Sequence, residues 1–97
     1  MPAYLVANYR ITNPERYGPY PAAVFPTLAA YGGEIIVADY ASEPIDGRSF
    51  NVTVVGKFPS KEAARAWYDS PEYQAIVRLR TDNTEGFLVL TDGFVMP

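Results

Sequence analysis

Apolar residues gather along the chain in four short runs that have the length of β-strands. The four runs cover residues 3–9, 34–40, 50–58 and 87–91. They are rich in valine, isoleucine and aromatic residues, a composition that is typical of strands. Residues 41–49 contain Pro44 and the pair Asp46-Gly47. We therefore expect a turn-rich loop between the second and third strands, which would pair antiparallel.

The first helical stretch begins at Asn13 and Pro14, which suit the N-cap and the first helical position. Beyond them, apolar and aromatic residues recur at spacings of three and four, which marks one face of a helix. These residues are Tyr17, Tyr20, Val24, Leu28 and Tyr31. Glycine and proline interrupt the pattern at residues 18–21. We predict a short first turn, a break, and a second helical piece that ends at Gly32-Gly33.

A second helical stretch begins at Ser60, a favourable N-cap residue, and extends to about Tyr68. The triplet Ser70-Pro71-Glu72 then offers a new N-cap, a proline at the first position and an acidic first turn, so we expect a further helix from there to about Asp82. The resulting order is β-α-β-β-α-β. It predicts a single ferredoxin-like α+β domain over residues 1–97, with a four-stranded antiparallel sheet and the helices on one face.

The strands are apolar on both of their alternating sides. One alternation set holds Tyr4, Val6, Ile36, Ala38, Val55, Leu88 and Leu90. The other holds Leu5, Ala7, Ile35, Val37, Val52, Val54, Phe87 and Val89. A sheet face in contact with water would carry polar residues at every second position, so the face without helices is an association surface. We predict a homodimer in which two sheets pack face to face and bury about 2,000 Å² or more in total.

The charge of the chain disfavours several kinds of partner. The formal net charge is −3, the pI is about 4.7, and no run of Lys or Arg is present. Binding to nucleic acid or to an anionic membrane is therefore not expected. The apolar runs are too short to span a bilayer. The first residues lack the features of a signal peptide, so we predict a cytoplasmic protein.

The chain contains no cysteine and no histidine. This excludes a disulfide and a thiolate nucleophile, and it disfavours a transition-metal site. Histidine is the side chain that normally titrates near neutral pH, so an acid or base in this protein would be Asp, Glu, Lys or Tyr with a displaced pKa. We expect no metal and no cofactor. A haem group would have only Met or Tyr as an axial ligand, which is a poor fit.

Several sequence words together resemble a known family. They are Tyr4-Leu5-Val6-Ala7, Asn13-Pro14-Glu15-Arg16-Tyr17, Tyr31-Gly32-Gly33, Phe58-Pro59-Ser60 and residues 63–73. Over nearly the whole chain they resemble the domain-of-unknown-function family thirteen-thirty. The resemblance implies the dimeric α/β-barrel superfamily, whose members pair ferredoxin-like protomers through their sheets. That superfamily includes cofactor-independent oxygenases, isomerases, haem enzymes and ligand-binding modules, so the resemblance implies a fold and a dimer but no single activity.

The segment WYDSPEYQ, residues 67–74, combines three aromatic residues with two carboxylates and a serine. It permits two interpretations. In the structural one, Ser70 caps a helix while Trp67 and Tyr73 pack toward the sheet. In the functional one, Trp67 and Tyr73 line a pocket below the helix break, and the free N–H groups there bind an anion. The structural interpretation is favoured, because capping alone accounts for the serine.

Polar residues on otherwise apolar strands form a second candidate group. They are Asn8, Arg10, Asp39, Thr53 and Lys57. Such residues either form an internal hydrogen-bond network or provide the polar part of a small cavity between sheet and helices. The stripe of Tyr17, Tyr20 and Tyr31 is open to a similar choice, between a core or dimer contact and a pocket lined by hydroxyl groups.

These patterns lead to a first hypothesis for function. The protein would bind or convert a small hydrophobic metabolite in an aromatic-lined pocket, without metal or cofactor, by positioning and hydrogen bonding. The candidate ligand-binding residues are Asn8, Tyr17, Asp39, Trp67 and Tyr73. The alternative is a non-catalytic dimerisation or ligand-sensing module. The sequence does not decide whether the protein is an enzyme, and it assigns no catalytic residue.

Overall fold

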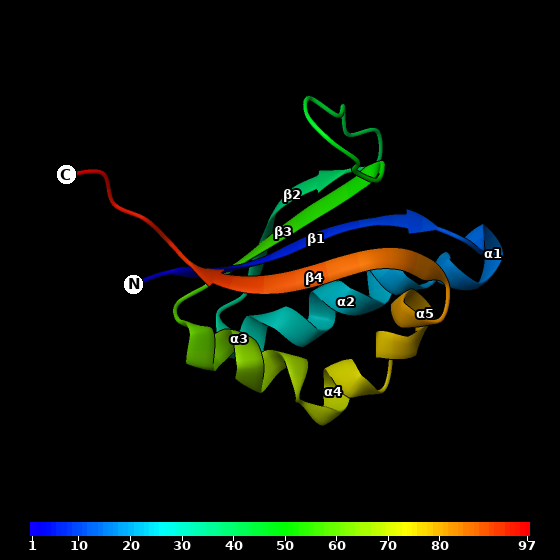
Figure 1. Ribbon diagram of the computed structural model, residues 1–97. Helices are drawn as coiled ribbons and strands as arrows, with labels where there is room; N and C mark the ends of the chain where they lie inside the picture. Colours follow the sequence, from blue (N-terminus) through cyan, green and yellow to red (C-terminus); the bar gives the residue numbers. More distant parts are fainter.

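The central strand, β1 (Ala3–Ile11), alternates between a buried and a half-buried side along most of its length. Leu5, Ala7 and Tyr9 point toward the helices, while Val6 and Asn8 point the other way, as the two-residue period of a strand requires. The computed structural model describes residues 1–97. It places β1 between two neighbours to which it pairs antiparallel (Figure 1).

The remaining strands complete a sheet of order β2-β3-β1-β4. They are β2 (Glu34–Asp39), β3 (Val52–Phe58) and β4 (Thr84–Asp92). Strands β2 and β3 pair antiparallel across the loop, with a register irregularity between Ile35 and Val37. The order of elements and the all-antiparallel pairing confirm the predicted ferredoxin-like α+β fold.

The first helical stretch is divided as the sequence predicts. It consists of α1 (Pro14–Tyr17), α2 (Tyr20–Leu28) and the 3-10 turn η1 (Ala29–Tyr31). The side chain of Asn13 caps α1, because its Oδ1 accepts a hydrogen bond from the backbone N–H of Arg16 at 3.2 Å. Gly32 ends η1 with φ of 70°, a left-handed conformation that glycine adopts without steric cost.

The second helical stretch has one more break than expected. It consists of α3 (Lys61–Tyr68), α4 (Pro71–Gln74) and α5 (Val77–Thr81). The prediction of a single helix from Ser70 to about Asp82 is wrong, because Ile76 leaves the helical region with φ of −120°. At that point the N–H of Ile76 donates to the carbonyl of Tyr73, three residues back, which tightens the last turn of α4. No helix in the chain has both the length and the apolar character that a membrane crossing needs.

All of the helices lie on one side of the sheet (Figure 1). The buried core forms between that sheet face and the helices, with Val52 and Phe58 from β3 and Tyr73 from α4 among its most buried members. Gly86 on β4 has φ of 155°, and a Cβ atom there would lie 2.2 Å from the carbonyl oxygen of Asn8. Glycine at this position therefore permits β1 and β4 to approach closely.

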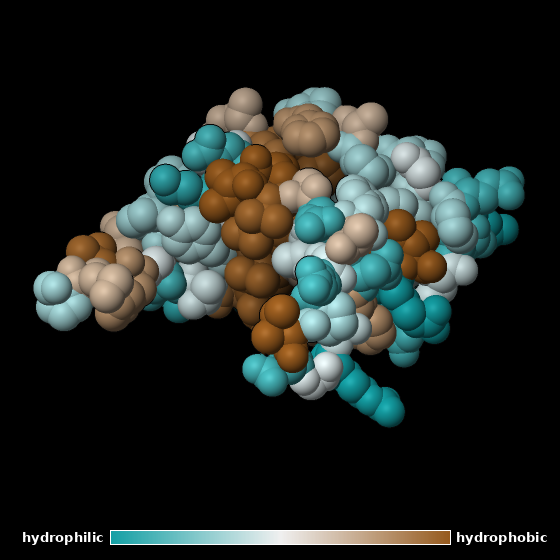
Figure 2. Space-filling view, turned by 90° about the horizontal axis from the view of Figure 1, so that it is seen from above, coloured by the Kyte–Doolittle hydropathy of each residue, from teal (hydrophilic) through white to brown (hydrophobic).

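The other side of the sheet carries a row of valines. Val37 pairs with Val55, Val55 with Val6, and Val6 with Val89, so that one valine from each strand lies on the same line. Figure 2 shows this outer face, where a band of hydrophobic side chains crosses the molecule. Both faces of the sheet are thus apolar.

The strand register also corrects the grouping expected from the sequence. Alternation within each strand groups Ala38, Leu88 and Leu90 with Val6 on one face, but they lie on the helix side of the sheet. The outer face instead receives Val37, Phe87 and Val89. The irregularity in β2 and the relative stagger of the strands cannot be read from alternation within one strand, because alternation does not fix register.

The joint between α3 and α4 depends on the side chain of Ser70, which is only 3% exposed. Its Oγ donates to the carbonyl of Trp67 at 2.7 Å and accepts from the N–H of Tyr73 at 3.2 Å. We therefore expect Ser70→Ala to lower the free energy of unfolding by about 1–2 kcal/mol, measured by urea denaturation.

Ser60→Ala is the matched control for this joint. Ser60 also caps a helix, with its Oγ accepting from the N–H of Ala63 at 3.1 Å, but it is half-buried and makes no second hydrogen bond. Its replacement should cost about 0.5–1 kcal/mol. A larger loss for Ser60→Ala than for Ser70→Ala would contradict the role assigned to Ser70.

Candidate ligand-binding cavity

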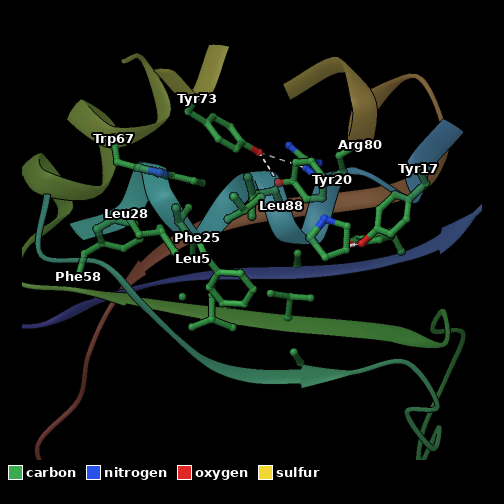
Figure 3. Close-up of a pocket in the computed structure, with 18 of the residues that line it drawn as sticks. Leu5, Tyr17, Tyr20, Phe25, Leu28, Phe58, Trp67, Tyr73, Arg80 and Leu88 are labelled. Atoms are coloured by element: carbon green, nitrogen blue, oxygen red, sulfur yellow. Dashed lines mark hydrogen bonds between the residues drawn. The ribbon is translucent and has the colours of Figure 1, made fainter. Parts of the chain in front are cut away.

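A cavity of about 90 Å³ lies between α2 and the helix-covered face of the sheet. Of the 19 residues that line it, 16 are hydrophobic. The mouth includes Phe25, which is 60% exposed, and Tyr40, which is 45% exposed. Figure 3 shows the aromatic and aliphatic side chains that converge on this space from the helices and from the sheet.

Three aromatic rings form one wall of the cavity. The ring of Trp67 packs against that of Tyr73 with a centroid separation of 4.0 Å, and against that of Phe58 at 5.5 Å. The indole N–H of Trp67 donates to Oγ1 of Thr27 on α2 at 2.9 Å, and that hydroxyl donates in turn to the carbonyl of Val24. The orientation of the indole is thus fixed by a bond across the helical layer.

Tyrosine hydroxyl groups supply most of the polar atoms of the cavity. Tyr9 and Tyr17 share a hydrogen bond with their oxygens 2.6 Å apart, and Tyr17 shares another with Tyr40 at 3.2 Å. In a second, separate hydrogen bond, the hydroxyl oxygens of Tyr20 and Tyr73 lie 2.6 Å apart. Five phenols from β1, α1, α2, α4 and the end of β2 therefore meet around one small space.

Arg80 is the only charged residue among those that line the cavity. It comes from α5, is 9% exposed, and donates from Nε to the hydroxyl oxygen of Tyr73 at 3.4 Å (Figure 3). The three salt bridges of the chain involve Arg10, Lys61 and Arg78, not Arg80. The cavity thus contains a cation whose side-chain hydrogen-bond partner is a phenol hydroxyl group and not a carboxylate.

The protonation states follow from burial. Burial raises the pKa of Tyr9, Tyr17 and Tyr20 above the ordinary value for a phenol. For Arg80, burial acts to lower the pKa, but the nearby Tyr73 and Tyr20 outweigh it and raise the pKa further. At neutral pH the phenols are therefore neutral and the guanidinium is charged. None of these groups is suited to act as a general base near pH 7.

The structure brings three of the five candidate residues together. Tyr17, Trp67 and Tyr73 all line the cavity. It does not bring Asn8 or Asp39 there, because both lie on the outer face, where Asn8 pairs with Thr53 and Thr53 with Asp39.

Asn8 has a structural role on that outer face. Its Oδ1 accepts from the N–H of Phe50 at 2.8 Å, and its Nδ2 donates to the carbonyl of Phe50 and to Oγ1 of Thr53, both at 3.0 Å. Ser42 joins the same network through its hydroxyl, 2.6 Å from that of Thr53. These bonds tie the long loop to β1, which is the internal network that the sequence left as one of two alternatives.

The helix joint at Ser70 also uses two of its N–H groups internally. The N–H of Ser70 donates to the carbonyl of Trp67, and the N–H of Tyr73 to the hydroxyl of Ser70. These N–H groups are therefore committed to the joint and are not offered to an anion. Within residues 67–74, the features that point to a pocket are the rings of Trp67 and Tyr73.

Sequence reasoning missed Tyr9 and Arg80. The position of Tyr9 at the cavity could have been inferred from the alternation of β1, which places Tyr9 on the same side as Leu5 and Ala7. Arg80 could have been found from helical spacing, because it lies seven residues after Tyr73 and three after Val77, on a face that is otherwise buried. An arginine at a core position of an amphipathic stretch is a signal that a charge is buried.

The fold defines the class of protein. It is a ferredoxin-like α+β fold. The family model "Domain of unknown function (DUF1330)" matches residues 2–94, so the chain belongs to this family. No match in sequence was found among curated proteins.

Solved structures share the fold. RPA0582 of Rhodopseudomonas palustris, a protein of unknown function, is 16% identical with a TM-score of 0.79, over 98% of this chain and 84% of that chain. SnoaB of Streptomyces nogalater, a cofactor-independent oxygenase, is 11% identical with a TM-score of 0.64, over 98% and 95% of the two chains. A dimeric ferredoxin-like protein of unknown function from Bacteroides fragilis is 14% identical with a TM-score of 0.53, over 95% of each chain. Identities this low show a common fold and nothing about activity.

The raised pKa values predict how stability depends on pH. The unfolded chain loses phenol protons near pH 10, whereas the folded chain retains those of Tyr9, Tyr17 and Tyr20. The stability that these three phenols contribute to the folded state is fully present below that pH. The free energy of unfolding then falls as the pH rises above about 10. Urea denaturation at about pH 8 and at about pH 10.5 measures this loss.

Tyr20→Phe should make the loss between these two pH values smaller, because one titrating phenol has been removed from the unfolded state. The quantity compared is the difference between the free energies of unfolding at the two pH values. Any effect of the substitution that is the same at both pH values therefore cancels. An unchanged difference in Tyr20→Phe would contradict the assignment of Tyr20 as a buried, neutral phenol.

Proposed function

We propose that the protein binds a small hydrophobic molecule in the cavity between sheet and helices, as a homodimer joined through the outer faces of its sheets. Tyr17, Trp67 and Tyr73 would contact the ligand. The observation that carries the proposal is the composition of the cavity, with 16 hydrophobic residues out of 19 and a few converging hydroxyl groups. This is the usual make-up of a site for a small organic ligand.

The size of the cavity sets the size of the ligand. At about 90 Å³ it is smaller than the apolar cavity of about 150 Å³ that accepts benzene in an engineered protein. The cavity would thus accept a ligand smaller than benzene, such as a short branched chain, and a ring would enter only if side chains at the mouth move. Phe25 is exposed at that mouth and lies where such a movement would enlarge the entrance.

Binding is better supported than conversion. Conversion without a metal or cofactor would rest on positioning and hydrogen bonds. No carboxylate lines the cavity, and burial raises the pKa of Tyr9, Tyr17 and Tyr20 rather than lowering it. This favours the second candidate function, a ligand-sensing or ligand-carrying module, over an enzyme with a general base. Recovery of an added ligand unchanged after long incubation would separate the two.

The dimer is proposed on the row of valines that crosses the outer face. Val37 and Val89 on the edge strands are exposed, and Val6 and Val55 between them are half-buried. Water in contact with such a row is unfavourable, and a second copy of the same face would remove it by two-fold symmetry. The dimeric state of the Bacteroides fragilis protein, which shares the fold, agrees with this proposal.

Filling the cavity tests ligand binding. Ala7 lines it from β1, so Ala7→Leu would place three additional carbon atoms in the space that a ligand needs. A metabolite library screened by thermal shift should give hits with the native protein. A ligand present at about 100 times its Kd stabilises by about 2.7 kcal/mol, and Ala7→Leu should abolish that stabilisation.

Ala66→Leu is the matched control, since Ala66 lies on the exposed side of α3 and does not line the cavity. This variant should respond to ligands as the native protein does. Ligands that stabilise Ala7→Leu as strongly as the native protein would place the binding site elsewhere and contradict the proposal.

A charge in the row of valines tests the dimer. Val6→Lys would place an ammonium group at the centre of the outer face, where burial against a partner costs several kcal/mol. Sedimentation should show a dimer for the native chain at micromolar concentration and a monomer of 10.7 kDa for Val6→Lys. Ala66→Lys changes the net charge equally on the opposite side of the molecule and should remain dimeric. A monomeric native protein would contradict the proposal.

A further inference from the structure

The guanidinium of Arg80 has no anionic partner within the chain. Removing a cation from water is strongly unfavourable unless an opposite charge or several good hydrogen bonds compensate. Arg80 is 9% exposed, and its only side-chain hydrogen bond is the 3.4 Å contact from Nε to Tyr73. No fully buried side-chain nitrogen of the chain lacks a partner, so the Nη atoms of Arg80 keep some accessible surface on which a ligand can be received. The chain has 11 acidic residues, yet none lines the cavity or pairs with Arg80.

The hydrogen-bond count shows an excess of donors on the same side. A guanidinium has five N–H groups, and one of them is used on Tyr73. Tyr20 and Tyr73 have two hydroxyl hydrogens, but a single contact joins their oxygens, so one hydrogen is left over. The hydrogen-bonded series Tyr9, Tyr17 and Tyr40 has three hydroxyl hydrogens for two contacts. One hydroxyl hydrogen is therefore left over there as well.

The donors and the apolar surface occupy different parts of one cavity. Arg80 and the hydroxyls of Tyr20 and Tyr73 form a polar end, while Phe58, Leu28 and the indole of Trp67 lie farther along the same space (Figure 3). A ligand that matches this arrangement has an acceptor group with a negative charge at one end and an apolar body at the other.

We propose that Arg80 receives the carboxylate of a small organic acid whose apolar remainder, a short branched chain, packs against Trp67 and Tyr73. The proposal rests on the proposed function and specifies the chemical class of its ligand. The planar guanidinium presents paired N–H groups that match the two oxygens of a carboxylate.

A carboxylate fits this site better than a phosphate does. A phosphate group carries up to two charges and three acceptor oxygens, and its sites combine several cations or backbone N–H groups. Here one cation and two spare hydroxyl hydrogens are present, within walls that are almost entirely apolar. One negative charge on a compact, planar group balances the single charge of Arg80.

The experiment uses pairs of probes that differ only in charge. Isobutyrate and isovalerate are compared with isobutyramide and isovaleramide, at neutral pH and at up to about 10 mM, which covers the weak affinity expected of ligands of this size. Trp67 is the only tryptophan of the chain and lines the cavity, so its fluorescence reports occupancy directly. We expect each acid to bind at least about tenfold more tightly than its amide, since hydrogen bonds to charged groups are the stronger ones.

Two variants at Arg80 test the assignment. Arg80→Met replaces the buried charge by an apolar side chain of similar length, a change that buried ion sites generally tolerate. It should remove the preference for the acid while the amide binds as before. Arg80→Lys keeps the charge but loses the paired N–H geometry, and it should retain a reduced preference. Circular dichroism establishes that both variants are folded, and Arg80→Lys alone suffices if Arg80→Met does not fold.

The outcomes separate this inference from the proposed function. If acids and amides bind equally to the native protein, the role of Arg80 is overturned, but the proposal of ligand binding in the cavity is not. The same conclusion follows if Arg80→Lys and Arg80→Met both keep the full preference for the acid over its amide. If no probe of either kind binds to the folded native protein and the library screen is also negative, the proposed function fails together with the inference.

Discussion

The alternation of side chains along β1 is the constraint on which the rest of the structure depends. Because β1 lies at the centre of the sheet, its buried side supplies the floor of the core and its other side supplies the middle of the outer face. Tyr9 belongs to a chain of phenols in the cavity, while its neighbour Asn8 anchors the long loop on the opposite side. One strand thus connects the two surfaces that carry the proposals, and a shift of its register by one residue would exchange them.

The electrostatics of the cavity follow from the same burial that forms the core. Desolvation keeps the phenols of Tyr17 and Tyr20 neutral, so they cannot balance the charge of Arg80. A charge in an apolar environment interacts more strongly with an opposite charge than it does in water. The features that make Arg80 costly to bury without an anionic partner are therefore the ones that would strengthen the binding of an anionic ligand.

Much of the fold could be predicted from local signals. Asn13, Ser60 and Ser70 each mark a helix start that the structure confirms, because a cap is a contact between residues close in sequence. The site was less accessible, since register and helix rotation decide which side chains meet. Alternation along β1 places Asn8 opposite Tyr9, but it does not show which side receives the helices, because both sides of the strand are apolar. Arg80 stands out only once its helical face is known to be buried.

The single layer of helices leaves a thin molecule. The Cα atoms span 39 × 36 × 16 Å, and only 18 of 97 residues are buried. A slab of this shape has little interior for its mass, and its outer apolar band adds nothing to stability while it is in contact with water. Covering that band by self-association would link folding to protein concentration, so that the melting temperature rises as the solution becomes more concentrated.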